Sequence, residues 1–261
     1  MPEEYAYRNG RPGRNTALPV QDYHATTPPE EYDLDFNFPV KVLESNGVRL
    51  EPLIPSLHAP YLYSQLSSTG SITFRYFGAK LPTSYSEYLT HIETLFHSPP
   101  TSCAFVIYDK SYTKENDGKG RIAGSIAYLN ANTAHQSIEI GFVCILPEFQ
   151  RTHVTTHAAG LLMQYALNPT PEGLGLRRVE WIAHSLNTPS QNAALRLGYT
   201  HEGLLRYHWR LDPSKEGSCK IEGDDWPVRH NWIGSVTVHD WNEEGKREHL
   251  KKLMDREVVL K

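Results

Sequence analysis

The sequence lacks the features that mark secreted, membrane and disulfide-stabilised proteins. It has only three cysteines, Cys103, Cys144 and Cys219, an odd number without CxxC spacing. This count argues against a disulfide framework and against a zinc site made of cysteine pairs, and it favours buried thiols in a reducing compartment. No apolar run is long enough to span a bilayer, and the first residues have no signal-peptide pattern. We therefore expect a cytoplasmic protein that does not act at a membrane.

An excess of positive charge is also missing. The 26 Lys and Arg residues are outnumbered by 30 Asp and Glu residues, which gives a net charge of -4. Such a chain offers no broad basic face to a phosphate backbone, so nucleic acid is not an expected partner. The 261 residues are 39% hydrophobic, which is enough for a substantial core. We expect one main domain with extensions.

The chain divides into an arm, a domain and a helical extension. Residues 1–44 are rich in Pro, Arg, Asn and Tyr without a helical or strand period, which predicts a partly ordered N-terminal arm. Residues 45–240 hold the periodic segments of the main domain, and residues 241–261 form the extension. A charged helix from about Glu243 to Arg256 is expected there, with Leu250, Leu253 and Met254 on one side. The arm has tyrosines that could dock on a surface: Tyr5, Tyr7, Tyr23 and Tyr32.

Periodicity predicts an alternation of strands and helices in the main domain. A first strand at 48–53 precedes helices around 59–66 and 85–92. Strands at 103–109, 121–130 and 137–146 follow as an antiparallel meander, and a helix around 158–166 leads to a strand at 177–184. After a helix ending at Gly198, residues 199–211 and 231–239 form a closing pair of strands. The polar excursion between them, 212–229, carries Gly217, Gly223 and many charges, which favours a mobile flap anchored by Trp226 and Pro227.

Two motifs stand out in this order of elements. The strand at 138–146 runs into a helix through a basic, polar turn, and this arrangement aims unpaired helix N–H groups at a phosphate. About thirty residues later, the run from Thr188 to Gln191 is typical of a capping box with proline at the first helical position. Gly198 stands where a left-handed helix stop belongs.

These motifs, together with the Glu-Gly-x-x-Arg run from Glu202 to Arg206, resemble the GNAT superfamily of acetyl-CoA-dependent N-acetyltransferases. The similarity is to its RimJ/RimL-like branch in a fungal form, and it covers roughly residues 45–240. It implies an α/β (α+β) fold: a mixed, mainly antiparallel sheet with a central, splayed parallel strand pair flanked by helices. It further implies acetyl-CoA as co-substrate, no metal, a small-molecule or peptide amine as acceptor, and a monomer or homodimer.

The resemblance implies two groups of acetyl-CoA contacts. Backbone amides at the strand end would polarise the thioester carbonyl, and the turn would hold the pyrophosphate. The family's turn reads Gln/Arg-x-x-Gly-x-Gly/Ala, whereas in this chain other residues fill both glycine positions in either register. Amides donate whatever the side chain, so we expect binding to survive if the turn keeps helical dihedrals without positive φ; a surface turn without a ligand is the alternative. The expected contacts are Val143, Cys144, Ile145 and Leu146 of the strand, Gln150, Arg151, Thr152, His153, Val154, Thr155 and Thr156 of the turn, and Asn187 and Ser190 beyond it.

The candidate general base is Glu139. Strict alternation puts Ile138, Ile140, Phe142 and Cys144 on one face of their strand and leaves Glu139 on the other, with Gly141 and Val143. A carboxylate in an otherwise apolar strand is expensive unless it is paired, solvated or functional. The similarity to the family's Glu-Ile-Gly-Tyr strand makes Glu139 a base that acts through water. The alternative is an exposed Glu on the wet side of the sheet.

Other polar residues have a catalytic and a structural interpretation. In the resemblance Asn187 contacts the pantetheine arm and Ser190 protonates the departing thiolate, while both would otherwise only cap a helix. His184 ends a strand beside the same cleft and is a second candidate base. Tyr199 is expected in the core rather than as an acid. His153 and His157 lack a companion set for a metal and are expected to rim the cofactor mouth.

Two other functions stay open on the sequence alone. The missing glycines are compatible with a degenerate, catalytically silent CoA-binding domain. The tyrosine-rich arm and the C-terminal helix are compatible with an interaction module. The sequence does not distinguish among protein N-termini, polyamines, amino acids, drugs and biosynthetic amines as acceptors.

Overall fold

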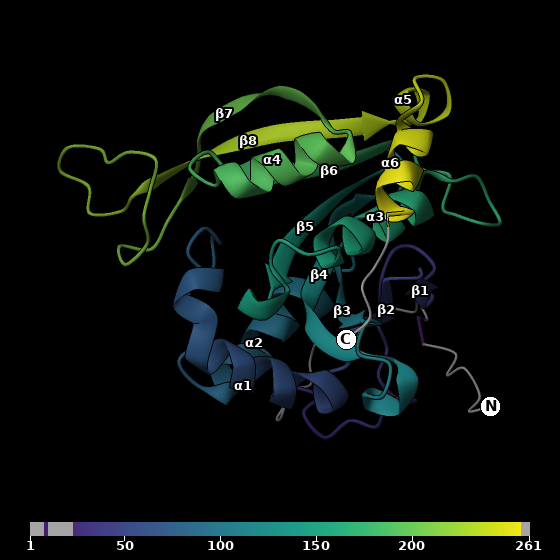
Figure 1. Cartoon of the computed structure of the whole chain (residues 1–261). Coiled ribbons are helices and arrows are strands. Elements are labelled where there is room, and N and C mark those ends of the chain that lie inside the picture. The colour runs from purple at the N-terminus through teal and green to yellow at the C-terminus, as the bar shows by residue number, and fades with distance from the viewer. Residues whose placement is uncertain (1–7, 10–22, 257–261) are drawn as a thin grey trace.

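The computed structural model describes residues 8–9 and 23–256 (Figure 1). Its strands are β1 (Leu43–Glu44), β2 (Val48–Pro52), β3 (Cys103–Asp109), β4 (Arg121–Asn132), β5 (Ser137–Ile145), β6 (Arg178–His184), β7 (Thr200–Arg210) and β8 (Val228–Thr237). Its helices are α1 (Pro55–Thr73), α2 (Tyr85–Ile92) continued by the π-helical turn η1 (Glu93–His97), α3 (Val154–Leu167), α4 (Thr188–Leu197), α5 (Val238–Asn242) and α6 (Lys246–Met254), with 3₁₀ turns η2 (Asn116–Gly118) and η3 (Pro147–Phe149).

The described strands form one sheet in the order β1-β2-β3-β4-β5-β6-β8-β7. Every neighbouring pair is antiparallel except β5 and β6, which are parallel and are joined through α3. The predicted fold class, a mixed and mainly antiparallel sheet with one central parallel pair, is therefore confirmed. None of the helices in the described part of the chain is long and apolar enough to cross a membrane.

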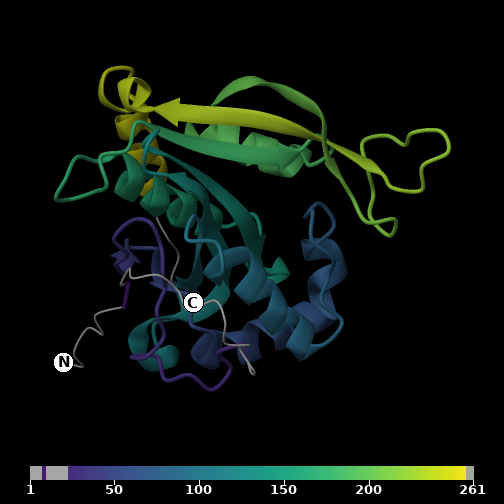
Figure 2. The same cartoon turned by 180° about the vertical axis from the view of Figure 1, so that it is seen from behind.

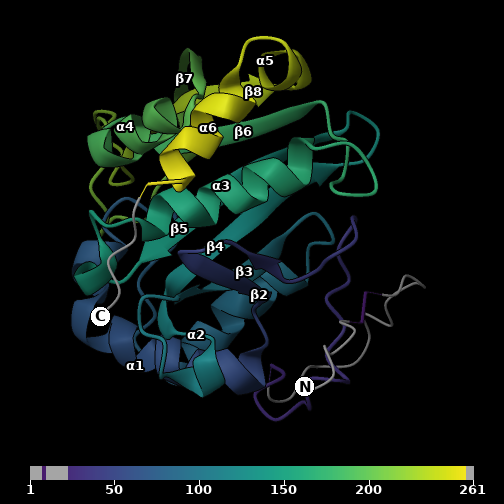
Figure 3. The same ribbon diagram turned by 45° about the vertical axis from the view of Figure 1, so that its right-hand side comes forward.

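Helices cover the two faces of the sheet at different places (Figures 1 and 3). On one face α3, α4 and α6 pack over the sheet and enclose the larger core, which includes Leu162, Trp181 and Leu250. On the other face α1 and α2 pack over β2 to β5 and enclose a second core around Leu66 and Val106. We call the first side the helical face.

The parallel pair separates soon after it forms. β5 and β6 pair only from Ser137 and Arg178 to Glu139 and Glu180. Beyond these residues β5 curves away toward α1 and α2, while β6 continues beside β8 (Figure 1). The predicted splay is therefore present, and it begins at Glu139.

A β-bulge in β5 corrects the predicted alternation. Cys144 pairs with Ser125 but Gly141 pairs with Ala127, so one residue of β4 faces two of β5. The extra residue is accommodated at Phe142, which has a φ of 49°. Phe142 and Cys144 consequently point to the core under α1 and α2, whereas Ile138 and Ile140 belong to the helical face. Strict alternation was wrong for Phe142, Val143 and Cys144 because a bulge reverses the faces beyond it.

Two other boundaries differ from the sequence prediction. The closing strand β8 begins at Val228 and ends at Thr237, where a capping box with Asp240 starts the short helix α5. The charged helix then begins at Lys246 rather than near Glu243. Gly245, which has a φ of 74°, interrupts the helical conformation between α5 and α6. Leu250, Leu253 and Met254 are buried as predicted.

Part of the N-terminal arm lies against the domain. Tyr32, Leu34 and Phe36 are buried, and β1 adds Leu43 to the edge of the sheet beside β2. Tyr23 packs against the core under α1 and α2, whereas Tyr5 and Tyr7 lie outside the described residues. The domain limits at residues 45 and 240 stay predictions.

Candidate functional site

The turn between β5 and α3 connects the end of the strand to the start of the helix. The amide of Gln150 donates from Nε2 to the carbonyl of Ile145 at 3.0 Å, which holds the turn to the strand end. Arg151 adopts a φ of 61° and its side chain is exposed. The condition set for the turn, helical dihedrals without positive φ, is not met at Arg151, although none of the residues in the family's glycine positions has positive φ.

Backbone donors gather at this end of the sheet. α3 begins at Val154, so the amides of Thr155 and Thr156 belong to the first turn, where a helix supplies no acceptor. Among the described residues, β5 has no pairing with β6 beyond Glu139, so backbone groups on this edge between Gly141 and Cys144 have no strand partner. These two sets of donors are the groups that the predicted cofactor contacts require.

The histidines of the turn do not rim this site with their side chains. His153 Nε2 lies 3.1 Å from an oxygen of Asp109 and 3.2 Å from the carbonyl of Gly47. His157 is buried and its Nδ1 contacts the hydroxyl of Ser45 at 2.9 Å. Both rings therefore pack toward β1, β2 and β3, and His153 can serve a ligand only through its amide.

The start of α4 confirms one capping prediction and corrects another. Asn187, rather than Thr188, is the N-cap, and its side-chain oxygen accepts from the amide of Ser190 at 3.2 Å. The predicted capping box is absent from this helix because the side chain of Gln191 donates instead to the carbonyls of His184 and Ser185. Gly198 has a φ of 103° and ends the helix as predicted.

Ser190 and Tyr199 both contact the indole of Trp181. Ser190 Oγ accepts from Trp181 Nε1 at 3.0 Å, which places the hydroxyl on the helical face. Tyr199 packs edge-on against the same indole with 5.6 Å between ring centroids. Its hydroxyl is buried and has no hydrogen-bond partner among the described residues. Tyr199 is in the core, as predicted, but it keeps an unused donor.

Glu139 is a buried carboxylate at the start of the splay. It is only 5% exposed, and one oxygen accepts from the amide of Asn130 at 2.7 Å. Burial raises the pKa of its carboxyl to about 7; the nearby Glu180 adds to this rise, while Asn130 and Arg229 oppose it. A Cβ on Gly141 would lie 2.9 Å from the other carboxylate oxygen. Glycine at position 141 therefore leaves room for the side chain of Glu139. Because Glu139 is buried, the alternative of an exposed Glu on the wet side of the sheet is wrong.

His184 does not share the environment of Glu139. Its Nδ1 accepts from the amide of Leu186 at 3.0 Å, and its Nε2 donates to the carbonyl of Glu216 at 3.3 Å. Burial and the charge of Arg229 lower the pKa of the imidazole. It lies four residues beyond Glu180 on β6, about 13 Å along the strand. Both nitrogens of His184 are therefore engaged, and its role as a second candidate base stays a prediction.

Sequence reasoning missed a group of buried polar residues on β8. Arg229 donates from Nε to Asn231 Oδ1 at 2.6 Å and from a guanidinium nitrogen to the carbonyl of Tyr76 at 3.2 Å. Strand pairing places Asn231 beside His184 and Glu139 beside Glu180. We call the surface formed by Glu139, Glu180, His184, Arg229 and Asn231 the polar face; it lies opposite the helical face. Burial, opposed by the charge of Glu139, lowers the pKa of Arg229 to about 10.

The insertion between β7 and β8 approaches the polar face. Glu216 forms an ion pair with Arg75 at 2.9 Å, and Asp212 forms one with Lys80 at 2.7 Å. These pairs join the insertion to the segment after α1. Figure 2 shows both segments from behind. A groove runs between the two segments, lined by Phe74, Arg75, Lys80, Leu81, Thr83, Ser214, Lys215 and Glu216. At the far end of the insertion, the guanidinium carbon of Arg210 lies over the ring of Trp226, 3.9 Å from the ring centroid.

The bulge itself is fixed by aromatic packing. Phe142 stacks on Phe77 with 4.5 Å between centroids and meets Phe96 edge-on at 4.8 Å. A non-glycine residue at positive φ costs roughly 1–2 kcal/mol, so this packing offsets the strain that opens the edge of β5. The neighbouring thiol of Cys144 is buried, and burial raises its pKa to about 12. A thiol in this state is not a nucleophile.

The predicted residues therefore form two groups on either side of the split sheet. The strand end, the turn, Asn187 and Ser190 lie at or toward the helical face, and Glu139 lies on the polar face. Between the two groups, the pairing of β5 with β6 does not extend beyond Glu139 and Glu180 in the described part of the chain. Such a site is suited to bring a phosphate-bearing donor and a separate nucleophile together at a buried base.

Comparison with known proteins agrees with this geometry. The family model described as the acetyltransferase (GNAT) domain matches residues 48–200. A crystal structure of a GCN5-related N-acetyltransferase from Brucella melitensis is 26% identical, with a TM-score of 0.66, over 83% of this chain and 86% of that chain. None of the curated protein sequences matches the chain.

Two more distant structures share the fold. One is an acetyltransferase from Salmonella typhimurium that modifies the N-terminal serine of ribosomal protein L7/L12; it is 16% identical, with a TM-score of 0.58, over 76% of this chain and 99% of that chain. Another is the RimL ribosomal L7/L12 alpha-N-protein acetyltransferase in complex with coenzyme A, 16% identical with a TM-score of 0.57 over 76% of this chain and 98% of that one.

Proposed function

The chain belongs to the GNAT acetyltransferase family, and from that premise we propose that it transfers the acetyl group of acetyl-CoA to a primary amine by direct attack in a ternary complex. The observation that carries this proposal is Glu139. It is a buried carboxylate with a pKa of about 7 at the point where β5 and β6 separate. A base whose pKa lies near neutral pH is suited to accept a proton from an ammonium group.

The helical face offers the contacts for acetyl-CoA. The first-turn amides of α3 and the exposed guanidinium of Arg151 suit the pyrophosphate. The unpaired edge of β5 around Val143 and Cys144 suits the pantetheine arm and the thioester carbonyl. Asn187 stands at the start of α4 on the other side of the gap.

In this proposal the proton transfers take place on different faces of the sheet. Glu139, through a water molecule, takes a proton from the amine, whose nitrogen forms a bond to the thioester carbon. The carbon–sulfur bond breaks, and the thiolate takes a proton from the hydroxyl of Ser190. The alkoxide of Ser190 is restored by the second proton on the nitrogen, which leaves a neutral amide. Burial raises the pKa of the Tyr199 hydroxyl, so this group is a poorer acid than the family resemblance requires. The buried, protonated thiol of Cys144 supports direct transfer without an acyl-enzyme.

A thiol-release assay over a panel of amines tests the proposal. The panel holds peptides with free N-termini, polyamines, amino acids and amine drugs, and a thermal shift with acetyl-CoA runs in parallel. Peptides are included because a distant relative modifies the N-terminal serine of a ribosomal protein. We expect a raised melting midpoint and amine-dependent release of CoA. A shift without release on any amine would support a silent CoA-binding domain, and no shift would support an interaction module.

A further inference from the structure

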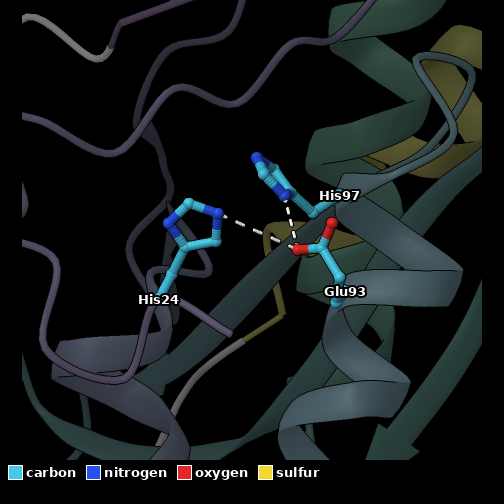
Figure 4. A group of neighbouring side chains, drawn as sticks. All are labelled: His24, Glu93 and His97. Atoms are coloured by element: carbon cyan, nitrogen blue, oxygen red, sulfur yellow. Dashed lines mark hydrogen bonds and ion pairs between the residues drawn. The ribbon is translucent and has the colours of Figure 1, made fainter. Parts of the chain in front are cut away.

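Three side chains from distant parts of the sequence converge beside α2, away from the two faces described above (Figure 4). His24 comes from the N-terminal segment, and Glu93 and His97 come from the π-helical turn η1. Glu93 Oε2 lies 2.6 Å from His97 Nδ1 and 4.0 Å from His24 Nε2. All three atoms lie within 4.8 Å of one another.

The hydrogen bonds on the far side of each ring orient these atoms. His97 Nε2 lies 2.8 Å from the carbonyl of Asp33, which can only accept, so this nitrogen carries a hydrogen. His24 Nδ1 lies 3.1 Å from the hydroxyl of Thr27. Each imidazole thus has one nitrogen held by an oxygen partner while the other faces Glu93. This is the arrangement that outer-shell partners impose on metal-binding histidines.

The contact between Glu93 and His97 requires a positive charge. In a neutral imidazole with its hydrogen on Nε2, Nδ1 carries a lone pair, and a carboxylate oxygen can only accept. Two acceptors 2.6 Å apart repel each other unless a proton or a cation lies with them. The second histidine, His24, brings its Nε2 to 4.0 Å from the same oxygen of Glu93, so the imidazoles of both histidines surround one carboxylate.

We propose that His24, Glu93 and His97 bind a zinc ion, with water as the fourth ligand. Zinc takes imidazole nitrogen and carboxylate oxygen at about 2.0–2.2 Å in tetrahedral geometry, which separates ligand atoms by roughly 3.3–3.5 Å. The distances of 2.6 Å and 4.0 Å lie on either side of that value, so small side-chain rotations complete the site. The ion plays no part in acetyl transfer.

Zinc at this position would join two segments that are 69 residues apart in sequence (from His24 to Glu93). It would tie the segment that carries Tyr32, Leu34 and Phe36 to the turn after α2. That turn also carries Phe96, which meets Phe142 edge-on at 4.8 Å. The site would therefore stabilise the support of the β5 bulge from outside the active site.

Zinc titration of untagged, full-length protein stripped with a chelator tests the proposal. We expect one zinc ion per chain by competition with a chromophoric chelator, and a higher melting midpoint with zinc. Cobalt(II), used as a second probe, should give the visible absorption of a tetrahedral site. His24→Ala should weaken zinc binding by more than the roughly 10–100-fold that loss of an outer-shell partner costs, and Thr27→Val should fall within that range.

A matched control comes from α5. His239 lies 3.3 Å from Glu243 at the same i, i+4 spacing as Glu93 and His97, but no second histidine accompanies the pair within the described residues. His239→Ala should leave zinc affinity and stoichiometry unchanged. Absence of saturable zinc binding in the wild type, or equal affinity in His24→Ala, would overturn the proposal in favour of a metal-free imidazolium–carboxylate pair.

Discussion

The two sides of the split sheet offer different kinds of chemical group to a substrate. On the helical face the candidate donor contacts are backbone amides of the turn and of α3, and the side chain of Asn187 is engaged in capping α4. On the polar face the candidate contacts are buried side chains, with Glu139 accepting from Asn130 and Arg229 donating to Asn231.

This difference predicts which substitutions should cost more activity. A helix N-terminus presents its amides whatever side chains it carries, so replacing the family's two glycines should not remove donors. The replacements are His153 and Thr155 in one register or Val154 and Thr156 in the other. A buried carboxylate has no such substitute, because its function depends on its charge and on its pKa. Substitutions on the polar face should therefore cost more activity than substitutions on the helical face.

The largest expected effect is that of Glu139→Gln. If Glu139 is the general base, its replacement by an uncharged isostere should lower kcat by about two to four orders of magnitude and leave acetyl-CoA affinity nearly unchanged. Steady-state kinetics and calorimetry measure the two quantities. Glu180→Gln is the matched control, because Glu180 lies beside Glu139 on the same face and is ion-paired with Arg178. A near wild-type rate in Glu139→Gln, with a large loss in His184→Ala, would reverse the assignment.

The pKa of Glu139 adds a pH signature to the same prediction. The base must be ionised, so kcat/KM should rise with pH through about 7 and then level off, and this limb should vanish in Glu139→Gln.

The stability of the wild type should change with pH in the opposite direction. Because folding raises the pKa of Glu139 from 4.5 to about 7, its contribution to stability is fully present below about pH 4.5 and is lost as pH rises through 7. Glu139→Gln should then be the more stable protein at pH 8, by up to about 3 kcal/mol.

A smaller effect is expected from Arg151→Ala on the helical face. Loss of one charge-assisted hydrogen bond should weaken acetyl-CoA binding by about 1.5–3 kcal/mol while kcat stays close to wild type. Arg151→Gly separates charge from backbone conformation, because glycine adopts the φ of 61° without strain. Arg151→Lys should recover part of the affinity. Isothermal titration measures the affinity for acetyl-CoA. If all three variants bind acetyl-CoA as tightly as the wild type, the backbone amides act alone.

The sequence predicted the parts of this site that depend on local chemistry. The strand, the turn and α3 follow from periodicity, and the end of α4 follows from Gly198, whose φ of 103° favours glycine. The splay was implied by the family resemblance, and the burial of Cys103 and Cys144 followed from their apolar neighbours.

The rest depends on contacts between distant residues, which a single sequence does not encode locally. The bulge falls on Phe142, a residue type that gives no signal of positive φ, because packing on Phe77 and Phe96 holds it there. Arg229 was assigned to the end of a mobile insertion, yet it is buried against Asn231 and Tyr76. Only tertiary structure brings such partners together.

The smallest expected effect comes from the insertion at 212–229, which covers the approach to the polar face. Replacing residues 214–224 with a short linker removes the Glu216–Arg75 ion pair and the carbonyl that accepts from His184. Exposed ion pairs contribute little to stability, so the fold should persist. Acceptor KM or selectivity should shift several-fold because one wall of the groove beside Phe74 is lost, while acetyl-CoA affinity should stay unchanged because its contacts lie on the helical face. Kinetics on each accepted amine, with Glu216→Gln as the milder variant, measure this. Unchanged constants for every amine would mean that the insertion is a surface loop and that the polar face alone selects the acceptor.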